Sequence, residues 1–136
     1  GFCLHEEEVE GLRQKLASLD SFEPYSVYRL IDTINKKEIW PEDFIHLFKI
    51  EKGENLSQEE ASAFIRILDY ESKGFLTIEN LSHCVLPRLD KQLREYCSMK
   101  PIQENALSDD QEAKQELTSF LLDLIKKEVK FYLTTQ

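Results

Sequence analysis

Glycine and proline are scarce in this chain, with four of each among 136 residues. Long irregular loops draw on both residue types, so we expect most of the chain to form regular elements. No apolar stretch approaches the roughly 20 residues that a membrane-spanning helix requires, and the opening segment GFCLHEEE lacks the pattern of a secretory signal peptide. The sequence therefore predicts one compact domain with no membrane insertion.

Cysteine and positive charge are also in short supply. Cys3, Cys84 and Cys97 are odd in number, widely spaced and without a CxxC pair, which argues against a disulfide framework or a zinc site and favours a reducing, intracellular setting. The 17 Lys and Arg residues are outnumbered by 26 Asp and Glu residues, and the formal net charge is −9. This negative charge argues against nucleic acid or an anionic membrane as the main partner.

Apolar residues recur at helical spacing along most of the chain, and no segment alternates with the period of two typical of a strand. Val9, Leu12, Leu16 and Leu19 fall at steps of three and four residues, which indicates a first amphipathic helix. The predicted fold class is all-α. We divide the chain into an N-terminal amphipathic helix, a central helical region and C-terminal helices, at 1–21, 22–89 and 90–136.

Capping signals mark where several helices begin. Ser57 with Glu60 forms a capping box, and Asp90 precedes the segment KQLREYCSM. Ser108 with Gln111 forms another capping box before the terminal helix, after the linker-like stretch KPIQENAL. Together with the apolar spacing, these signals predict further helices at about 24–31, 41–50, 59–68, 78–86, 91–99 and 111–133.

An internal repeat organises the centre of the chain. Residues 27–48, VYRLIDTINKKEIWPEDFIHLF, align with residues 64–85, FIRILDYESKGFLTIENLSHCV. In each unit an apolar helix leads into a polar loop that Asp32 or Asp69 opens, and Ile39 or Leu76 lies in the second half of the loop. The other matched pairs are Arg29 and Arg66, Lys36 and Lys73, Glu42 and Glu79, and Phe44 and Leu81.

Over residues 22–86, about half of the chain, this pattern resembles a degenerate tandem pair of EF-hands, the helix–loop–helix modules of the calmodulin-like superfamily. The resemblance implies a lobe of four helices whose two loops pair. In such a loop, calcium takes oxygens from the first, third, fifth, seventh and ninth positions and from a bidentate Glu at the twelfth, with glycine at the sixth.

The second loop keeps part of that ligand set. Gly74 stands at the sixth position, but Lys73 brings a cation to the fifth, and Asn80 at the twelfth offers one neutral oxygen in place of a bidentate carboxylate. We therefore expect calcium binding here to be weak at best. The candidate ligands are Asp69, Glu71, Phe75 through its carbonyl, Thr77 and Asn80.

The first loop departs further from the pattern. Asp32 opens it, but Lys37 replaces the glycine, and Asp43 at the twelfth position is one methylene shorter than Glu. The third, fifth and ninth positions hold Ile34, Lys36 and Trp40. We expect no calcium in this loop.

The lysines at the fifth positions suggest how the loops fold without an ion. In this hypothesis, Lys36 lies among Asp32, Glu38 and Asp43, and Lys73 lies among Asp69 and Glu71, so that each ammonium replaces part of the missing ion charge. The alternative is that both lysines simply point into water.

An open lobe of this kind exposes an apolar groove that binds an amphipathic helix. The candidate groove residues, which serve equally well as an ordinary core, are Leu30, Phe44, Leu47, Phe48, Phe64, Leu68, Leu81 and Val85. The terminal helix carries an apolar stripe too wide to face solvent, made of Leu117, Phe120, Leu121, Leu124, Ile125, Val129 and Tyr132. Either this helix folds back and fills the groove, or it packs on another protein. Near its end, Lys126, Lys127 and Lys130 suit the helix dipole.

No group of residues has the spacing of an enzyme site. His83 and Cys84 are adjacent and face about 100° apart on a helix, while His5 and His46 have no partner at metal-ligand spacing. We therefore expect a non-catalytic structural or interaction adaptor that works without calcium or another cofactor. Its expected partner is an amphipathic helix or a filament assembly, as with similar degenerate EF-hand proteins of cytoskeletal and ciliary structures. The alternative is a weak calcium sensor acting through the second loop.

Overall fold

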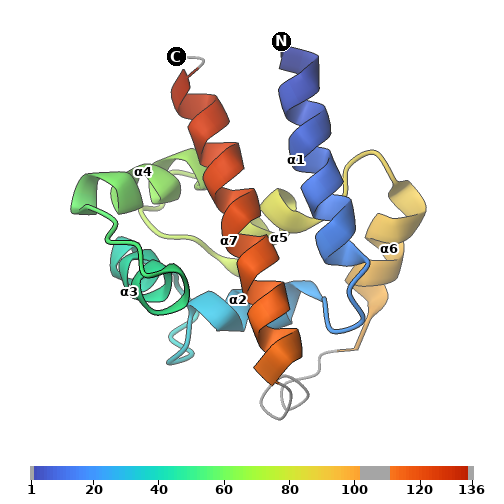
Figure 1. Ribbon diagram of the computed structural model, residues 1–136, viewed down its shortest axis with the longest axis horizontal. Helices are drawn as coiled ribbons and strands as arrows, with labels where there is room; N and C mark the ends of the chain where they lie inside the picture. Colours follow the sequence, from blue (N-terminus) through green and yellow to red (C-terminus); the bar gives the residue numbers. More distant parts are fainter. Residues whose placement is uncertain (1, 102–110, 135–136) are drawn as a thin grey trace.

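The computed structural model of the protein describes residues 2–101 and 111–134. These residues form seven α-helices and, besides them, a single isolated β-bridge, so the predicted all-α fold class is confirmed (Figure 1). None of the described helices is both long enough and apolar enough to cross a membrane. The helices are α1 (Phe2–Ala17), α2 (Pro24–Ile31), α3 (Pro41–Lys52), α4 (Gln58–Leu68), α5 (Ile78–Val85), α6 (Lys91–Met99) and α7 (Gln111–Thr134).

Side-chain caps fix where several helices begin. At α4, Ser57 Oγ accepts from the Glu60 N–H at 3.1 Å, and the Glu60 carboxylate accepts from the Ser57 N–H at 3.2 Å, which confirms the predicted capping box. Asp90 caps α6 as predicted, because its carboxylate accepts from the Leu93 N–H at 3.0 Å. The capping box expected at Ser108 lies outside the described residues.

The two helix–loop–helix units of the repeat, α2–α3 and α4–α5, meet at their loops. Ile39 and Leu76 form an antiparallel bridge in which each N–H donates to the other residue's carbonyl at 2.9 Å. Both side chains are fully buried, and the Tyr28 hydroxyl donates to the Leu76 carbonyl at 3.3 Å. The mid-loop apolar residues matched by the repeat are therefore the residues that join the two loops.

Helix α7 crosses the middle of the molecule and is the element that closes the core (Figure 1). It contacts α1 and all four helices of the repeat, α2 to α5, while α6 packs on α1. Helices α1 and α7 run antiparallel, so the start of α1 and the end of α7 lie at the same end of the molecule (Figure 1). The flanking helices are thus part of one core with the repeat.

Three apolar positions differ from the predicted stripes. Tyr132 is 40% exposed and Phe120 is only partly buried, whereas Leu122, absent from the predicted stripe, is fully buried. The buried face of α7 is wide in its middle because helices pack on several of its sides there, and it narrows toward the C-terminal end.

Candidate functional site

The groove expected between the helices of the repeat is occupied by α7. All eight candidate groove residues are buried, and they form one core cluster with the α7 residues Leu117, Leu121, Leu124, Ile125 and Val129. Of the two arrangements left open by the sequence, the structure has the one in which the terminal helix folds back onto the lobe. An incoming helix therefore cannot enter this groove unless α7 leaves it.

In the first loop a lysine ammonium lies between the two carboxylates that begin and end the loop. Lys36 Nζ lies 2.7 Å from both Asp43 carboxylate oxygens and 3.4 Å from Asp32 Oδ1. The Asp32 side chain is fully buried and that of Lys36 is 28% exposed. Burial alone would lower the pKa of Lys36, but the contacts with Asp43 and Asp32 outweigh it and raise that pKa. This half of the lysine hypothesis agrees with the geometry, with Asp32 and Asp43 as the partners and Glu38 instead accepting from the Trp40 indole.

Hydrogen bonds from backbone N–H groups to the opening carboxylate hold the first loop in the same turn as the second. The Asp32 carboxylate accepts from the N–H groups of Lys36 at 3.1 Å and Lys37 at 2.8 Å. Lys37 has φ 67°, a left-handed conformation that side-chain-bearing residues rarely adopt, and it stands where the second loop has Gly74 with φ 91°. The fourth positions also match, with positive φ at Asn35 and Ser72. The two loops thus share a backbone path although their side chains differ.

In the second loop, no ammonium group of the described residues lies between the loop carboxylates. Asp69 Oδ2 accepts from the Gly74 N–H at 2.7 Å, but Asp69 Oδ1 is buried with no hydrogen-bond partner among the described residues. Lys73 Nζ lies 3.4 Å from Glu71, and both side chains are more than 40% exposed. The hypothesis placed Lys73 between Asp69 and Glu71. In the described chain the side chain of Lys73 points outward, and its only ion pair is the exposed one with Glu71.

Asn80, at the last position of the second loop, takes part in the capping box at the start of α5. Asn80 Oδ1 accepts from both the backbone N–H and the hydroxyl of Thr77, at 2.9 and 3.0 Å. Its Nδ2 is buried and unpartnered within the described residues. An amide N–H₂ in that place repels a cation, so the donor set of the second loop fits calcium poorly. No group of three or more His, Cys, Asp or Glu residues at metal-binding geometry occurs in the described parts of the chain.

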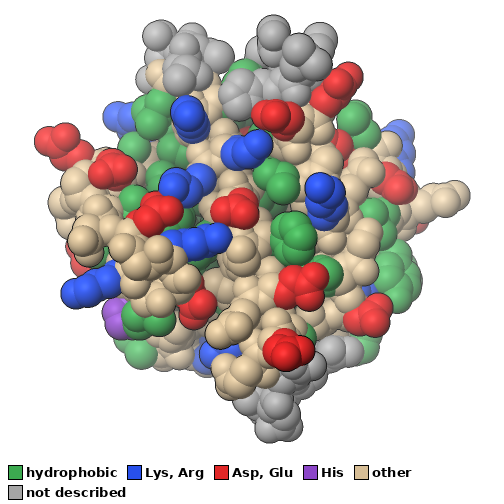
Figure 2. Space-filling view, in the orientation of Figure 1, with side chains coloured by type: hydrophobic (Ala, Val, Ile, Leu, Met, Phe, Trp, Pro, Cys, Tyr) green, Lys and Arg blue, Asp and Glu red, His purple; other side chains and the backbone are tan. Residues whose placement is uncertain are grey.

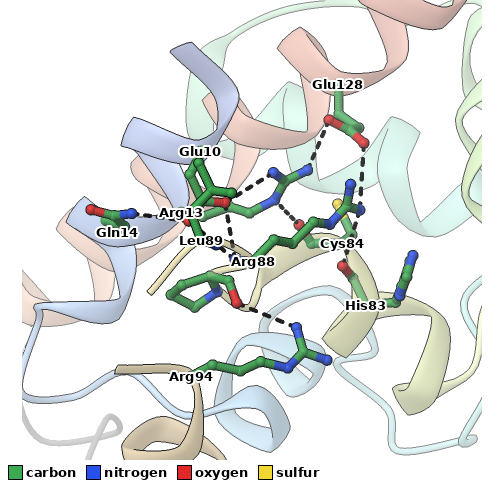
Figure 3. Close-up of polar contacts among 10 residues, drawn as sticks. Glu10, Arg13, Gln14, His83, Cys84, Arg88, Leu89, Arg94 and Glu128 are labelled. Atoms are coloured by element: carbon green, nitrogen blue, oxygen red, sulfur yellow. Dashed lines mark hydrogen bonds and ion pairs between the residues drawn. The ribbon is translucent and has the colours of Figure 1, made fainter. Parts of the chain in front are cut away.

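A buried cluster of charges joins the flanking helices to the repeat (Figure 3). Arg13 on α1 contacts Glu10 at 3.4 Å and Glu128 on α7 at 3.1 Å, and its Nε donates to the Cys84 carbonyl at 2.8 Å. Arg13, Glu10 and Glu128 are each at most 5% exposed. The cluster therefore ties α1, α7 and the end of α5 together at one point.

Glu10 also caps the chain between α5 and α6. Its carboxylate accepts from the backbone N–H of Arg88 at 3.0 Å and from that of Leu89 at 3.0 Å, and from the side chain of Gln14 at 3.0 Å. Burial acts to raise the pKa of Glu10, but these hydrogen bonds and Arg13 outweigh it and hold the pKa below its usual value.

This cluster was not predicted from the sequence, although a signal for it exists. Arg13 is four residues after Val9 and three before Leu16, so it lies on the apolar face of the first helix. Glu128 likewise follows Leu124 by four residues and Ile125 by three. A charge of each sign within two apolar stripes indicates a buried ion pair between two helices that pack together.

An open cleft of about 650 Å³ lies between α1, α4 and the C-terminal half of α7. Its apolar lining comes from Leu12, Leu56, Phe64, Val129 and Leu133, and its charged lining from Glu60, Asp123, Lys126, Lys127 and Lys130. Over α7 and α4, the face drawn in Figure 2 carries Lys and Arg side chains close to hydrophobic ones, with acidic side chains interspersed. Leu133 is 44% exposed at the end of the cleft. The cleft combines apolar surface with amino groups, and it could not be predicted from the sequence because its walls come from three separate segments.

The described cysteines and histidines form no reactive pair. Burial raises the pKa of the Cys84 thiol to about 12, with the Glu128 carboxylate adding to the shift. Burial and the nearby Arg88 lower the pKa of His83, whose ring lies tilted against that of Tyr70 with the centroids 5.4 Å apart. Burial likewise raises the pKa of Cys97. Thiols held in this way are poor nucleophiles.

Comparison with models of protein families, with curated proteins and with solved structures found no match for this chain.

Proposed function

We propose that this chain is a non-catalytic interaction adaptor that works without calcium and binds an amphipathic helix of a partner protein in the cleft between α1, α4 and α7. The observation that carries the proposal is the cleft, in which the half-exposed Leu133 and the partly buried Leu12 lie beside a row of lysines. Accessible apolar surface rimmed by polar residues is typical of an interaction site.

Independence from calcium is supported by the first loop. The Lys36 ammonium neutralises Asp32 and Asp43, the two carboxylates that would otherwise face each other inside the loop. The chain therefore has an internal substitute for part of the charge of an ion. A place in a cytoskeletal or ciliary assembly stays a prediction from the family resemblance.

A pull-down from cell lysate tests this proposal when it is run with calcium and with a chelator. We expect the same proteins to be captured in both buffers, and Leu133→Asp to abolish their capture because it puts a charge into the cleft. Leu89→Asp is the matched control, since Leu89 is 75% exposed and does not line this cleft. Capture that requires calcium, or that survives Leu133→Asp, would contradict the proposal.

The second candidate function, a weak calcium sensor, is favoured by one observation. Asp69 Oδ1 is a buried carboxylate oxygen without a partner among the described residues, and such an oxygen suits a cation. Trp40 reports on both loops, because its ring lies 5.4 Å from the Phe75 ring of the second loop. Under the adaptor proposal, Trp40 fluorescence is unchanged between millimolar calcium and chelator. A saturating change would support the sensor instead.

A further inference from the structure

Lysines gather beside the cleft on the last turns of α7, in a chain whose net charge is −9. Lys126, Lys127 and Lys130 all line the cleft, together with two acidic residues, Glu60 and Asp123. The acidic residues already have partners. Glu60 accepts from the Ser57 N–H in the α4 capping box, and Asp123 lies 3.3 Å from Lys52.

The positive charges of the three lysines are balanced less completely by ion pairs. Lys126 contacts Glu54 at 2.8 Å, and Lys127 is 3.7 Å from Glu8, with both members of each pair at least 40% exposed. Ion pairs as exposed as these are weak and leave the lysines available to a partner. Lys130 has no ion pair within the described residues. Amino groups are therefore available at the rim of the apolar cleft.

The helix dipole does not account for these lysines. The effect is confined to the last turn of a helix, and the last turn of α7 contains no basic residue. Lys126 and Lys130 are four residues apart and repel each other along one face of the helix. An anionic group bound between them would relieve that repulsion.

We propose that the partner helix is acidic, with apolar side chains that enter the cleft and Asp or Glu side chains that meet Lys126, Lys127 and Lys130. The inference rests on the proposed function and adds the charge of the partner. The segment of α7 along the cleft, from Asp123 to Leu133, spans about 15 Å at the rise of an α-helix. A partner segment of about ten helical residues matches that length.

The test uses three synthetic amphipathic peptides of about 14 residues. They share their Leu and Phe positions and carry Glu, Gln or Lys at the polar positions. Fluorescence anisotropy measures their binding to the full chain in chelator. We expect the Glu peptide to bind roughly tenfold more tightly than the Lys peptide at low salt, with a smaller difference at physiological salt.

Lys130→Glu shows whether the selectivity comes from this cleft. We expect the variant to lose most of the preference for the Glu peptide, and Lys130→Gln to lose part of it. Lys91→Glu is the matched control, because Lys91 is exposed on α6 and does not line the cleft. Lys130 has no described ion pair to break, so both variants should melt at the wild-type temperature.

The outcomes separate this inference from the proposed function. Equal binding of all three peptides, abolished by Leu133→Asp, would overturn the acidic partner and leave the adaptor standing. Tighter binding of the Lys peptide would do the same. Binding of no peptide would overturn both, as would a fluorescent fatty acid that binds in the cleft where no peptide does.

Discussion

The two loops of the repeat follow one backbone path but contain different chemistry. Positive φ angles occur at the same two positions of each loop, and Ile39 and Leu76 bridge them symmetrically. Inside the first loop, Lys36 forms ion pairs with the carboxylates of Asp32 and Asp43. Inside the second, a carboxylate oxygen of Asp69 and the amide nitrogen of Asn80 are both buried without described partners.

The difference teaches that the shape of such a loop and its ion chemistry are separable. The backbone turn needs a carboxylate at the first position to accept N–H groups, and both loops supply one. The charge at the centre can then come from a side chain, as in the first loop. The second loop keeps a buried carboxylate oxygen without a described partner, whereas Lys36 already pairs with both carboxylates of the first, so restored ligands should act in one loop only.

The largest effect should come from completing the ligand set of the second loop. Lys73→Asp with Asn80→Glu supplies oxygens at the fifth and twelfth positions and removes the cation. If the dissociation constant reaches about 10 µM, about 1 mM calcium should stabilise the fold by roughly 2.7 kcal/mol. Urea unfolding with calcium and with chelator measures this gain.

The first loop provides the matched control for that experiment. Lys36→Asp with Asp43→Glu makes the same changes there, but Ile34 and Trp40 still occupy the third and ninth positions. We expect no calcium-dependent gain and a less stable protein, because the carboxylates lose their internal cation. Equal gains from both pairs of substitutions would show that the loops do not differ as described.

The sequence predicted the part of this comparison that depends on local spacing. The repeat matched Ile39 with Leu76 and Asp32 with Asp69, and the structure places each pair at equivalent points of two paired loops. The repeat alone did not show that Lys36 and Lys73 are placed differently, because both occupy the fifth position of their loops. The residue at the twelfth position explains the difference. Asp43 forms an ion pair with Lys36, whereas the neutral Asn80 offers Lys73 no charge to pair with.

Tertiary packing was harder to predict than the loops. The apolar stripe of the terminal helix was recognised, but its spacing fits a helix that fills the groove of its own chain as well as one that binds another protein. In the structure the helix fills the groove of its own chain, since its leucines share one core cluster with the groove residues, and the buried Arg13–Glu128 ion pair joins α1 to α7. Charged residues on a helix are usually solvated, so the spacing of Arg13 and Glu128 within two apolar stripes indicates burial without showing which helices meet.

Removing the cation from each loop should give the second largest effect. Lys36→Met leaves the buried Asp32 carboxylate next to Asp43 without compensation, and we expect a loss of about 2 kcal/mol in the free energy of unfolding. Lys73→Met breaks only an exposed pair and should cost less than about 0.5 kcal/mol. Urea unfolding in chelator measures both. Equal losses, or no loss for Lys36→Met, would contradict the role given to Lys36.

Replacing the opening carboxylate of each loop by an amide should give a smaller difference. Asp32→Asn loses charge-assisted contacts to two backbone N–H groups and to Lys36, so we expect a loss of about 1.5 kcal/mol. Asp69 accepts one N–H and has an unpartnered oxygen, so Asp69→Asn should cost about 0.5 kcal/mol. Thermal melts in chelator rank the two variants, and the reverse order would count against the description of the loops.

The smallest effect is a difference in alkaline stability. The pKa of Lys36 is raised in the folded state, because its contacts with Asp43 and Asp32 outweigh the effect of burial. Its contribution to stability is therefore complete below the ordinary lysine value of 10.5 and is lost as the pH rises through the folded-state pKa. The difference in the free energy of unfolding between wild type and Lys36→Met should therefore narrow as the pH rises above 10.5. Burial and nearby carboxylates also raise the pKa of Tyr28, but this phenol is present in both proteins and cancels in the difference. The difference in the free energy of unfolding between wild type and Lys73→Met is small and should stay constant over the same pH range. A constant difference for Lys36→Met would mean that the Lys36 ammonium does not stabilise the first loop.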